Sequence, residues 1–177
     1  MSMSSSMVDL LRHRAAEQPH DRAYVFLSEK GNEEAELTFA ELHRRADIVA
    51  AHLARHLRKG DRALLMFPPG LDFVLALFGA LVAGVIAVPI MPPRRTSARD
   101  SSESIIADCG ARVVLTTSGL MANRVDILAR LRPDQLEWIP VDTLPEIPSG
   151  ELGSLLLTRE TLPFSNIPRG PPRRRRA

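Results

Sequence analysis

The sequence predicts an α/β protein whose open, mostly parallel, flavodoxin-like sheet is flanked by helices and preceded by a helix and a β-hairpin. From residue 61 onward, continuous apolar segments alternate with helical segments, which is the pattern of parallel strands joined by right-handed crossovers. An amphipathic helix with clear start signals precedes this alternation. The 177 residues, 45% of them hydrophobic and 25% charged, suffice for one globular core.

The N-terminal elements are a helix and a hairpin. A helix is expected from Met7 to Gln18, because Ser6 can cap its start and Pro19 cannot continue it. Residues 22–28 and 35–39 are then expected to pair as two strands around the polar turn "EKGNEE".

The second helix has the most complete signals. Thr38 and Glu41 form a capping box, and Leu37 is placed to contact Leu42 as a hydrophobic staple. Gly60 is expected to end the helix as its C-terminal cap. Apolar residues at helical spacing form its buried face: Leu42, Ala46, Val49, Ala50, Leu53 and Leu57.

The sheet begins with a strand, a helix and a second strand. We expect the strand "RALLMF" at residues 62–67, an apolar helix from Leu71 to Ala83 and a buried strand from Val85 to Ile90. The remaining elements are expected, in the order helix, strand, helix, strand, at residues 98–108, 112–117, 120–131 and 136–142.

The uncharged stretch from Phe73 to Met91 is nearly long enough to span a membrane. Gly79, Gly84 and Pro89 interrupt it, and its composition changes from Leu, Ala and Phe to the β-branched "VIAVPI". A buried helix, a glycine stop and a buried strand are therefore favoured over a transmembrane segment.

Charge and cysteine content indicate a cytoplasmic protein. The formal net charge of +2 becomes −3 when the five arginines of the last nine residues are set aside, so it does not predict a nucleic-acid partner. The single cysteine, Cys109, cannot form an internal disulfide and suits a reducing compartment. The N-terminus reaches charged residues too soon for a secretory signal.

No motif predicts a metal centre. The five histidines lie on or beside polar helix faces, and we expect surface positions for them. His52 and His56 are four residues apart on a helix, as metal ligands can be, but no third ligand joins them in the motif.

The last fifteen residues, "PFSNIPRGPPRRRRA", can encode a phosphate-binding loop in a different reading frame. Read one base earlier, with third codon bases chosen freely, Pro163 to Ala177 can give "AFLQYTSGST-x-TPKG", where x is Ala, Thr, Ser or Pro. In the frame given, this segment has no lysine, and Pro168, Pro171 and Pro172 lack the backbone N–H that a phosphate loop uses. The alternative is a natural Pro/Arg-rich disordered tail.

Three segments resemble the N-terminal part of the adenylate-forming superfamily, which includes acyl-CoA synthetases, nonribosomal adenylation domains and fatty acyl-AMP ligases. They are "LTFAELHRRADIVAAHL", "KGDRALLMFPPGLDFVLALFGALVAGVIAVP" and "ARVVLTTSGL", and the similarity covers residues 7–142. The double prolines of "PPG" and "VPIMPPRR", with the recovered "FLQYTSGST", are most similar to fatty acyl-AMP ligases.

The resemblance implies an enzyme that activates a fatty acid with ATP and Mg²⁺ to an acyl-adenylate and passes the acyl group to an acyl carrier protein. It implies an incomplete N-terminal domain here: an α/β subdomain at residues 1–142, a linker at 143–161 and an aberrant tail at 162–177. It assigns no catalytic, cofactor-binding or metal-binding residue to this chain. We therefore expect a truncated fatty acyl-AMP ligase that binds no cofactor and is inactive alone.

Other interpretations remain open at this stage. The chain could be a fragment of an acyl-CoA synthetase, or could work together with a separately encoded remainder. It could also be a stand-alone binding module whose arginine tail contacts nucleic acid or an anionic membrane, although no aromatic residues interleave the arginines. A truncated sheet would expose an edge through which copies self-associate.

Overall fold

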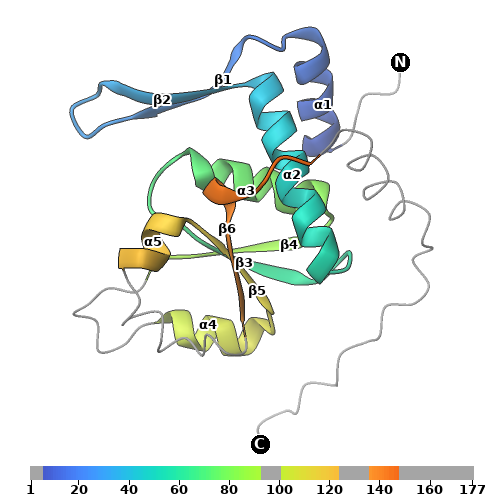
Figure 1. Ribbon diagram of the computed structural model, residues 1–177, viewed down its shortest axis with the longest axis vertical. Coiled ribbons are helices and arrows are strands. Elements are labelled where there is room, and N and C mark those ends of the chain that lie inside the picture. Colours follow the sequence, from blue (N-terminus) through green and yellow to red (C-terminus); the bar gives the residue numbers. More distant parts are fainter. Residues whose placement is uncertain (1–5, 93–100, 124–135, 148–177) are drawn as a thin grey trace, which may run out of the picture.

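The computed structural model describes residues 6–92, 101–123 and 136–147. It contains a two-stranded hairpin and a four-stranded sheet with helices on both faces (Figure 1). The elements, in chain order, are α1 (Met7–Glu17), β1 (Arg22–Leu27), β2 (Glu33–Thr38), α2 (Phe39–His56), β3 (Arg62–Met66), α3 (Leu71–Val82), β4 (Ile86–Ile90), α4 (Ser101–Cys109), β5 (Val113–Thr116), α5 (Ser118–Asn123), β6 (Glu137–Pro140) and the short 3₁₀ helix η3 (Val141–Thr143).

The four-stranded sheet is parallel and has the order β4-β3-β5-β6. Numbered from the first strand of this sheet, the order is 2-1-3-4, as in flavodoxin-like folds. Leu64 of β3 lies in register between Val88 of β4 and Val114 of β5. The hairpin β1–β2 is antiparallel and extends away from the sheet (Figure 1). The predicted fold class is confirmed.

Both faces of the sheet are buried along its central strands β3 and β5, which explains why these strands are continuously apolar. Leu65 and Leu115 belong to the cluster that packs under α2 and α3, whereas Leu64 and Val114 belong to the cluster that packs against α4 and α5. Figure 1 shows α2 and α3 on one side of the sheet and α4 on the other. A third cluster joins α1, α2, α3 and the end of β2 around Leu42.

The predicted start signals of α2 are confirmed. Thr38 Oγ1 accepts a hydrogen bond from the Glu41 N–H at 3.2 Å, and the Glu41 carboxylate accepts one from the Thr38 N–H at 2.9 Å. Leu37 and Leu42, the predicted staple, are both buried in the third cluster. Hydrogen bonds donated by backbone and hydroxyl of Thr38 hold the pKa of Glu41 below its ordinary value.

The prediction that Gly60 caps α2 is wrong. The helix ends at His56, and Leu57 is extended and buried, so its side chain joins the core instead of continuing the helix. Gly60, at φ +87°, makes the turn into β3 and donates its N–H to the Gly84 carbonyl at 2.9 Å. Packing of Leu57 therefore ends the helix at His56, four residues before the glycine.

The uncharged stretch divides into a helix and a strand as predicted, but the strand is not buried along its length: Ile86 is exposed and Ile90 is the buried residue of β4, which lies at the edge of the described sheet. The stretch runs from α3 through Gly84, at φ +66°, into β4. Among the residues that the structure describes, no helix is both long and apolar enough to cross a membrane.

Two predicted helices reach beyond the described residues. Residues 98–100 and 124–131 of these helices are among those that the structure does not describe, as are residues 148–177 with most of the predicted linker and all of the tail.

Candidate functional site

The carboxyl edge of the parallel sheet is the first place to look for a site, because open α/β sheets bind ligands where the strand order reverses. Here that point lies between β3 and β5. The "PPG" turn, Pro68 to Gly70, leads from β3 into α3, and Thr117 leads from β5 into α5. At the neighbouring strand, β6 passes directly into η3.

Asp142 joins the ends of β5 and β6. Its Oδ1 accepts a hydrogen bond from the Ser118 N–H at 2.8 Å, and its Oδ2 accepts one from the Ser118 hydroxyl. Burial disfavours the ionised carboxyl, but the hydrogen bonds from Ser118 outweigh it and hold the pKa of Asp142 below its ordinary value. With both oxygens engaged, Asp142 serves as a structural acceptor rather than a general base.

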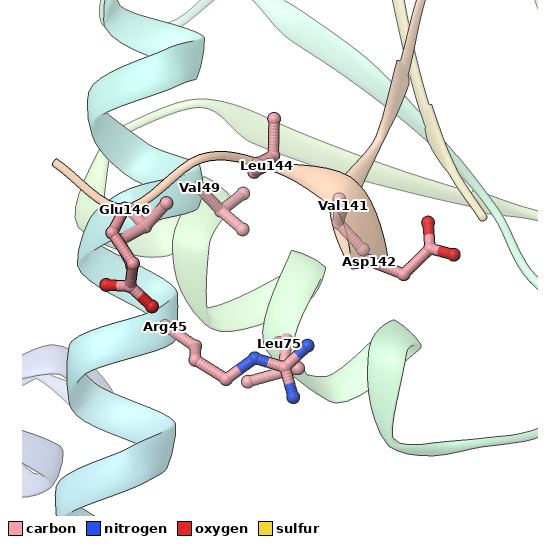
Figure 2. A pocket seen from close by; sticks show the side chains of 8 residues that line it. Arg45, Val49, Leu75, Val141, Asp142, Leu144 and Glu146 are labelled. Carbon is pink, nitrogen blue, oxygen red and sulfur yellow. The ribbon is translucent and has the colours of Figure 1, made fainter. Parts of the chain in front are cut away.

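Arg45 of α2 lies across this edge from Asp142 (Figure 2). Its Nη2 is 3.6 Å from Asp72 Oδ1, in the first turn of α3. Burial raises the pKa of Asp72; Arg45 opposes this shift, and the charge of Asp142 adds to it. One guanidinium thus lies near carboxylates of α3 and η3, and its ion pair with Asp72 links α2 to α3 at the carboxyl edge.

A small cavity lies between these groups. It measures about 140 Å³ and is lined by Arg45, Ile48, Val49, Leu75, Val141, Asp142, Leu144 and Glu146 (Figure 2). Small-molecule sites usually measure about 300–1,000 Å³. The cavity is therefore too small to hold a nucleotide, and each of its charged side chains is paired with a residue outside the lining: Arg45 with Asp72, Asp142 with Ser118 and Glu146 with Arg44.

The segment that follows η3 packs against α2. Leu144 packs against the core cluster, and Glu146 forms an ion pair with Arg44. His52 is hydrogen-bonded to the backbone of Pro145. These contacts hold residues 144–146 against α2.

A larger groove lies away from the carboxyl edge, between α1, β1, α2 and α3. Its volume is about 470 Å³. Its floor includes Leu42 and Phe78, and the exposed side chains of Met7, Leu10 and Tyr24 line it. The groove is mainly apolar, and nothing in it is arranged for covalent chemistry.

Of the two histidines of α2 considered as a metal pair, His56 is exposed as predicted, whereas His52 is only partly exposed. His56 Nδ1 is 2.7 Å from Glu137 Oε2, so this pair links α2 to β6. His52 Nε2 is shielded from solvent without a hydrogen-bond partner, and burial, followed by the charge of Arg55, lowers the pKa of His52. Within the described ranges, no group of three or more His, Cys, Asp or Glu side chains could hold a metal ion.

The sequence analysis named no site residue and missed the side chains that meet at the carboxyl edge: Arg45, Asp72, Ser118 and Asp142. A signal existed for Asp142, which is the last residue of a predicted strand of the parallel sheet. Residues 163–177, where the sequence predicts a displaced phosphate loop, lie outside the described residues.

The geometry agrees with the comparisons with known proteins. The sequence profile of the family described as AMP-binding enzyme matches residues 11–158. The chain belongs to this family. Its elements also match the crystal structure of a fatty acyl-adenylate ligase from L. pneumophila, in complex with acyl adenylate and pyrophosphate, with a TM-score of 0.69 and 30% identity over 86% of this chain and 25% of that one.

The relatives of this AMP-binding family member include enzymes of fatty-acid activation. The medium-chain-fatty-acid–(acyl-carrier-protein) ligase JamA of Moorena producens (strain JHB) is 35% identical over 80% of this chain and 25% of its own length. The long-chain-fatty-acid–AMP ligase FadD23 of Mycobacterium tuberculosis (strain CDC 1551 / Oshkosh) is 34% identical over 74% of this chain and 22% of its own. The chain thus spans about a quarter of these relatives and is close to the fatty acyl-AMP ligases.

Proposed function

We propose that this chain is the N-terminal portion of a fatty acyl-AMP ligase. The carrying observation is the match to the L. pneumophila fatty acyl-adenylate ligase, which extends over 86% of this chain at a TM-score of 0.69. The name of JamA supports an acyl carrier protein as the acceptor. A reducing, cytoplasmic setting suits the single cysteine, Cys109.

In the proposed reaction, a fatty acid carboxylate attacks the α-phosphate of ATP, and pyrophosphate leaves with magnesium assisting. The thiol of an acyl carrier protein then attacks the acyl carbon, forming a thioester and releasing AMP. The described residues would contribute the scaffold of the first subdomain. In it, the pairs Ser118–Asp142 and Arg45–Asp72 fix the carboxyl edge of the sheet from which the following segment departs.

We further propose the division inferred from the sequence: a subdomain at residues 1–142, a linker at 143–161 and a displaced phosphate-loop segment at 162–177. The end of the family match at residue 158, shortly before Pro163, supports the last of these boundaries. The 177-residue chain should then be inactive by itself, since the proline-rich segment lacks the lysine and several N–H donors of a phosphate loop.

Two experiments test these proposals. Calorimetry on the 177-residue chain should detect no magnesium-dependent ATP binding that persists in moderate salt, although the tail arginines should attract any polyanion at low salt. Micromolar, magnesium-dependent, salt-resistant binding would refute the inactive-fragment proposal.

The second experiment extends the chain in the shifted frame through the downstream coding sequence. The extended protein should catalyse fatty-acid-dependent exchange of pyrophosphate into ATP and should prefer a carrier-protein thiol to free coenzyme A. A mutant with Ala in place of the loop lysine is the matched control and should lose exchange. A folded product without exchange for any fatty acid would refute the proposal.

An acyl-CoA ligase is the second candidate. A relative from Mycobacterium tuberculosis (strain ATCC 25618 / H37Rv), provisionally named a fatty-acid–CoA ligase (fadD25), is 38% identical over 70% of this chain. Efficient formation of acyl-CoA by the extended protein would favour this alternative.

A further inference from the structure

An apolar surface lies open between α1 and the base of the hairpin, in the groove of about 470 Å³. Met7 and Leu10 of α1 are 56% and 46% exposed, and Tyr24 of β1 is 39% exposed. These three side chains line the groove, and Leu42 and Phe78 form part of its floor. Apolar side chains gathered in an exposed groove are typical of a surface that another molecule covers.

The same groove holds one cation and one anion without an ionic partner among the described residues. Arg14 and Asp21 both line it and are both exposed. The Arg14 guanidinium donates a hydrogen bond to the neutral side chain of Gln18 at 2.7 Å, and within the described part of the chain neither Arg14 nor Asp21 belongs to an ion pair. Arg22, the remaining charged residue of the lining, is already paired with two glutamates of β2. Arg14 and Asp21 therefore each leave a charge available to a group of opposite sign.

The two charges lie on different walls of the groove. Arg14 belongs to α1, as do Met7 and Leu10. Asp21 directly precedes β1 and lies with Tyr24 on the wall that the hairpin base forms. A two-fold axis running along the groove brings the α1 wall of one copy against the hairpin wall of the other, because such an axis exchanges the two sides. Both unpaired charges and both sets of apolar side chains then find a matching group.

We propose that this chain forms a two-fold dimer through the groove. Arg14 of each copy pairs with Asp21 of the other, and Met7 and Leu10 of each copy pack against Tyr24 of the other. The surface suits a second copy because it is self-complementary in both charge and apolar contact. The dimer does not depend on the proposed function, since the groove lies away from the carboxyl edge of the sheet.

The open edges of the described sheet are less suited to join two copies. Ile86 of β4 donates its N–H toward β3, and Glu137 of β6 donates its N–H toward β5, each at 2.8 Å. Because the N–H groups of a strand alternate between its two sides, the residue three positions later points its nitrogen outward in each case. Those residues are Pro89 and Pro140, which have no N–H to offer an added strand. The groove is therefore the better surface for self-association.

Sedimentation equilibrium of the 177-residue chain tests for this dimer. A standard interface takes about 20–30 residues from each partner, whereas 12 residues line the groove, so we expect a dimer that dissociates in the micromolar range. Leu10→Lys places a charge in the apolar contact and should weaken the dimer by about tenfold or more. Ile105→Lys is the matched control, because Ile105 is 37% exposed on α4, outside the groove, and this variant should dimerise like the native chain. Equal dimerisation of Leu10→Lys and the native chain, or association that continues beyond the dimer, would overturn the proposal.

An exchange of charges tests the pairing itself. Arg14→Glu brings carboxylates together in the dimer, and Asp21→Arg brings guanidinium groups together, so each variant alone should dimerise about tenfold more weakly than the native chain. Mixed in equal amounts, the two variants should form a heterodimer within about twofold of the native affinity, because both contacts then join opposite charges. Lys30→Glu changes the net charge as much as Arg14→Glu does but lies in the hairpin turn, outside the groove, and it should dimerise like the native chain.

Two outcomes of these measurements contradict the dimer. A mixture of the two charge variants that dimerises no better than its components would overturn the proposal. A native chain that stays monomeric would overturn it as well, and would favour the downstream part of a longer protein as the occupant of the groove.

Discussion

The contact between α2 and α3 is closest at Gly79, and a single methyl group there should destabilise the fold. A Cβ added at Gly79 would lie 2.5 Å from Val49 Cβ, 2.5 Å from Val49 Cγ1 and 3.1 Å from the Ala46 carbonyl oxygen. Carbon atoms in contact are normally about 3.5–4.0 Å apart, so the helices would have to separate by roughly 1 Å. Both helices bury their faces in the same cluster, which such a separation would disturb.

The magnitude of the Gly79→Ala effect follows from two opposing terms. Overpacking a close contact costs about 1–3 kcal/mol, whereas replacing glycine by alanine inside a helix gains about 1 kcal/mol. We expect a net loss of about 1–2 kcal/mol in the free energy of unfolding. Urea denaturation followed by circular dichroism measures it.

A double-mutant cycle isolates the contact. Val49→Ala alone should lose about 2 kcal/mol for the buried methyl groups and the space they leave. Combined with Gly79→Ala, this truncation removes the contact of the added methyl with Val49 Cγ1 but leaves the contact with Val49 Cβ, so the double mutant should be more stable than additivity predicts by about 0.5 kcal/mol or more. Gly119→Ala is the matched control, because a Cβ at that glycine has no neighbour within 4 Å. Gly79→Ala as stable as the native chain, or strict additivity, would refute this account of the helix contact.

Three further predictions concern the helix start, the carboxyl edge and the reading frame. Thr38→Ala removes the hydroxyl of the capping box and should destabilise the chain by about 1 kcal/mol in urea denaturation, whereas Thr38→Ser should not; equal losses would contradict the capping role. Because the pKa of Asp142 is depressed, its contribution to stability should be present above about pH 4 and lost as pH falls through the lower folded-state value. Ser118→Ala should shrink this pH-dependent part of thermal stability, and an unchanged profile would show that Ser118 does not stabilise the ionised carboxyl. Sequencing of the coding DNA should show that a one-base correction just before Pro163 opens a frame through "TSGST-x-TPKG" into several hundred further codons without a stop; bases that do not encode this loop would end the frame-shift hypothesis.

The local features of the chain could be predicted from the sequence because they depend on residues that are near neighbours. Thr38 and Glu41 are one helical turn apart, and their reciprocal hydrogen bonds form whenever that turn is helical. The apolar strands, and the segment before β4 that glycine interrupts, are likewise recognisable from the hydrophobic pattern of their own residues. These hydrophobic patterns, together with the three segments that resemble the adenylate-forming superfamily, were enough to predict the parallel sheet and its helices.

The candidate site could not be predicted in this way, because its side chains come from distant segments. Ser118 and Asp142 are 24 residues apart and meet only because β5 and β6 are adjacent and end together. The ion pair of Arg45 with Asp72 depends on the packing of α3 against α2.

Burial was also decided by the tertiary structure. Asp47 falls between apolar positions of a helix that the sequence treats as one-sided, yet its side chain is buried in the folded chain. The sequence predicts Gly60 as the C-terminal cap of α2, but α2 ends earlier because Leu57 packs into the core. The sequence by itself determined the helices and strands, their order and the family, since these follow from short-range hydrophobic periodicity and from short sequence motifs. Only the packed structure decided which polar groups lose water and which partners they find, because desolvation depends on what other segments of the chain cover.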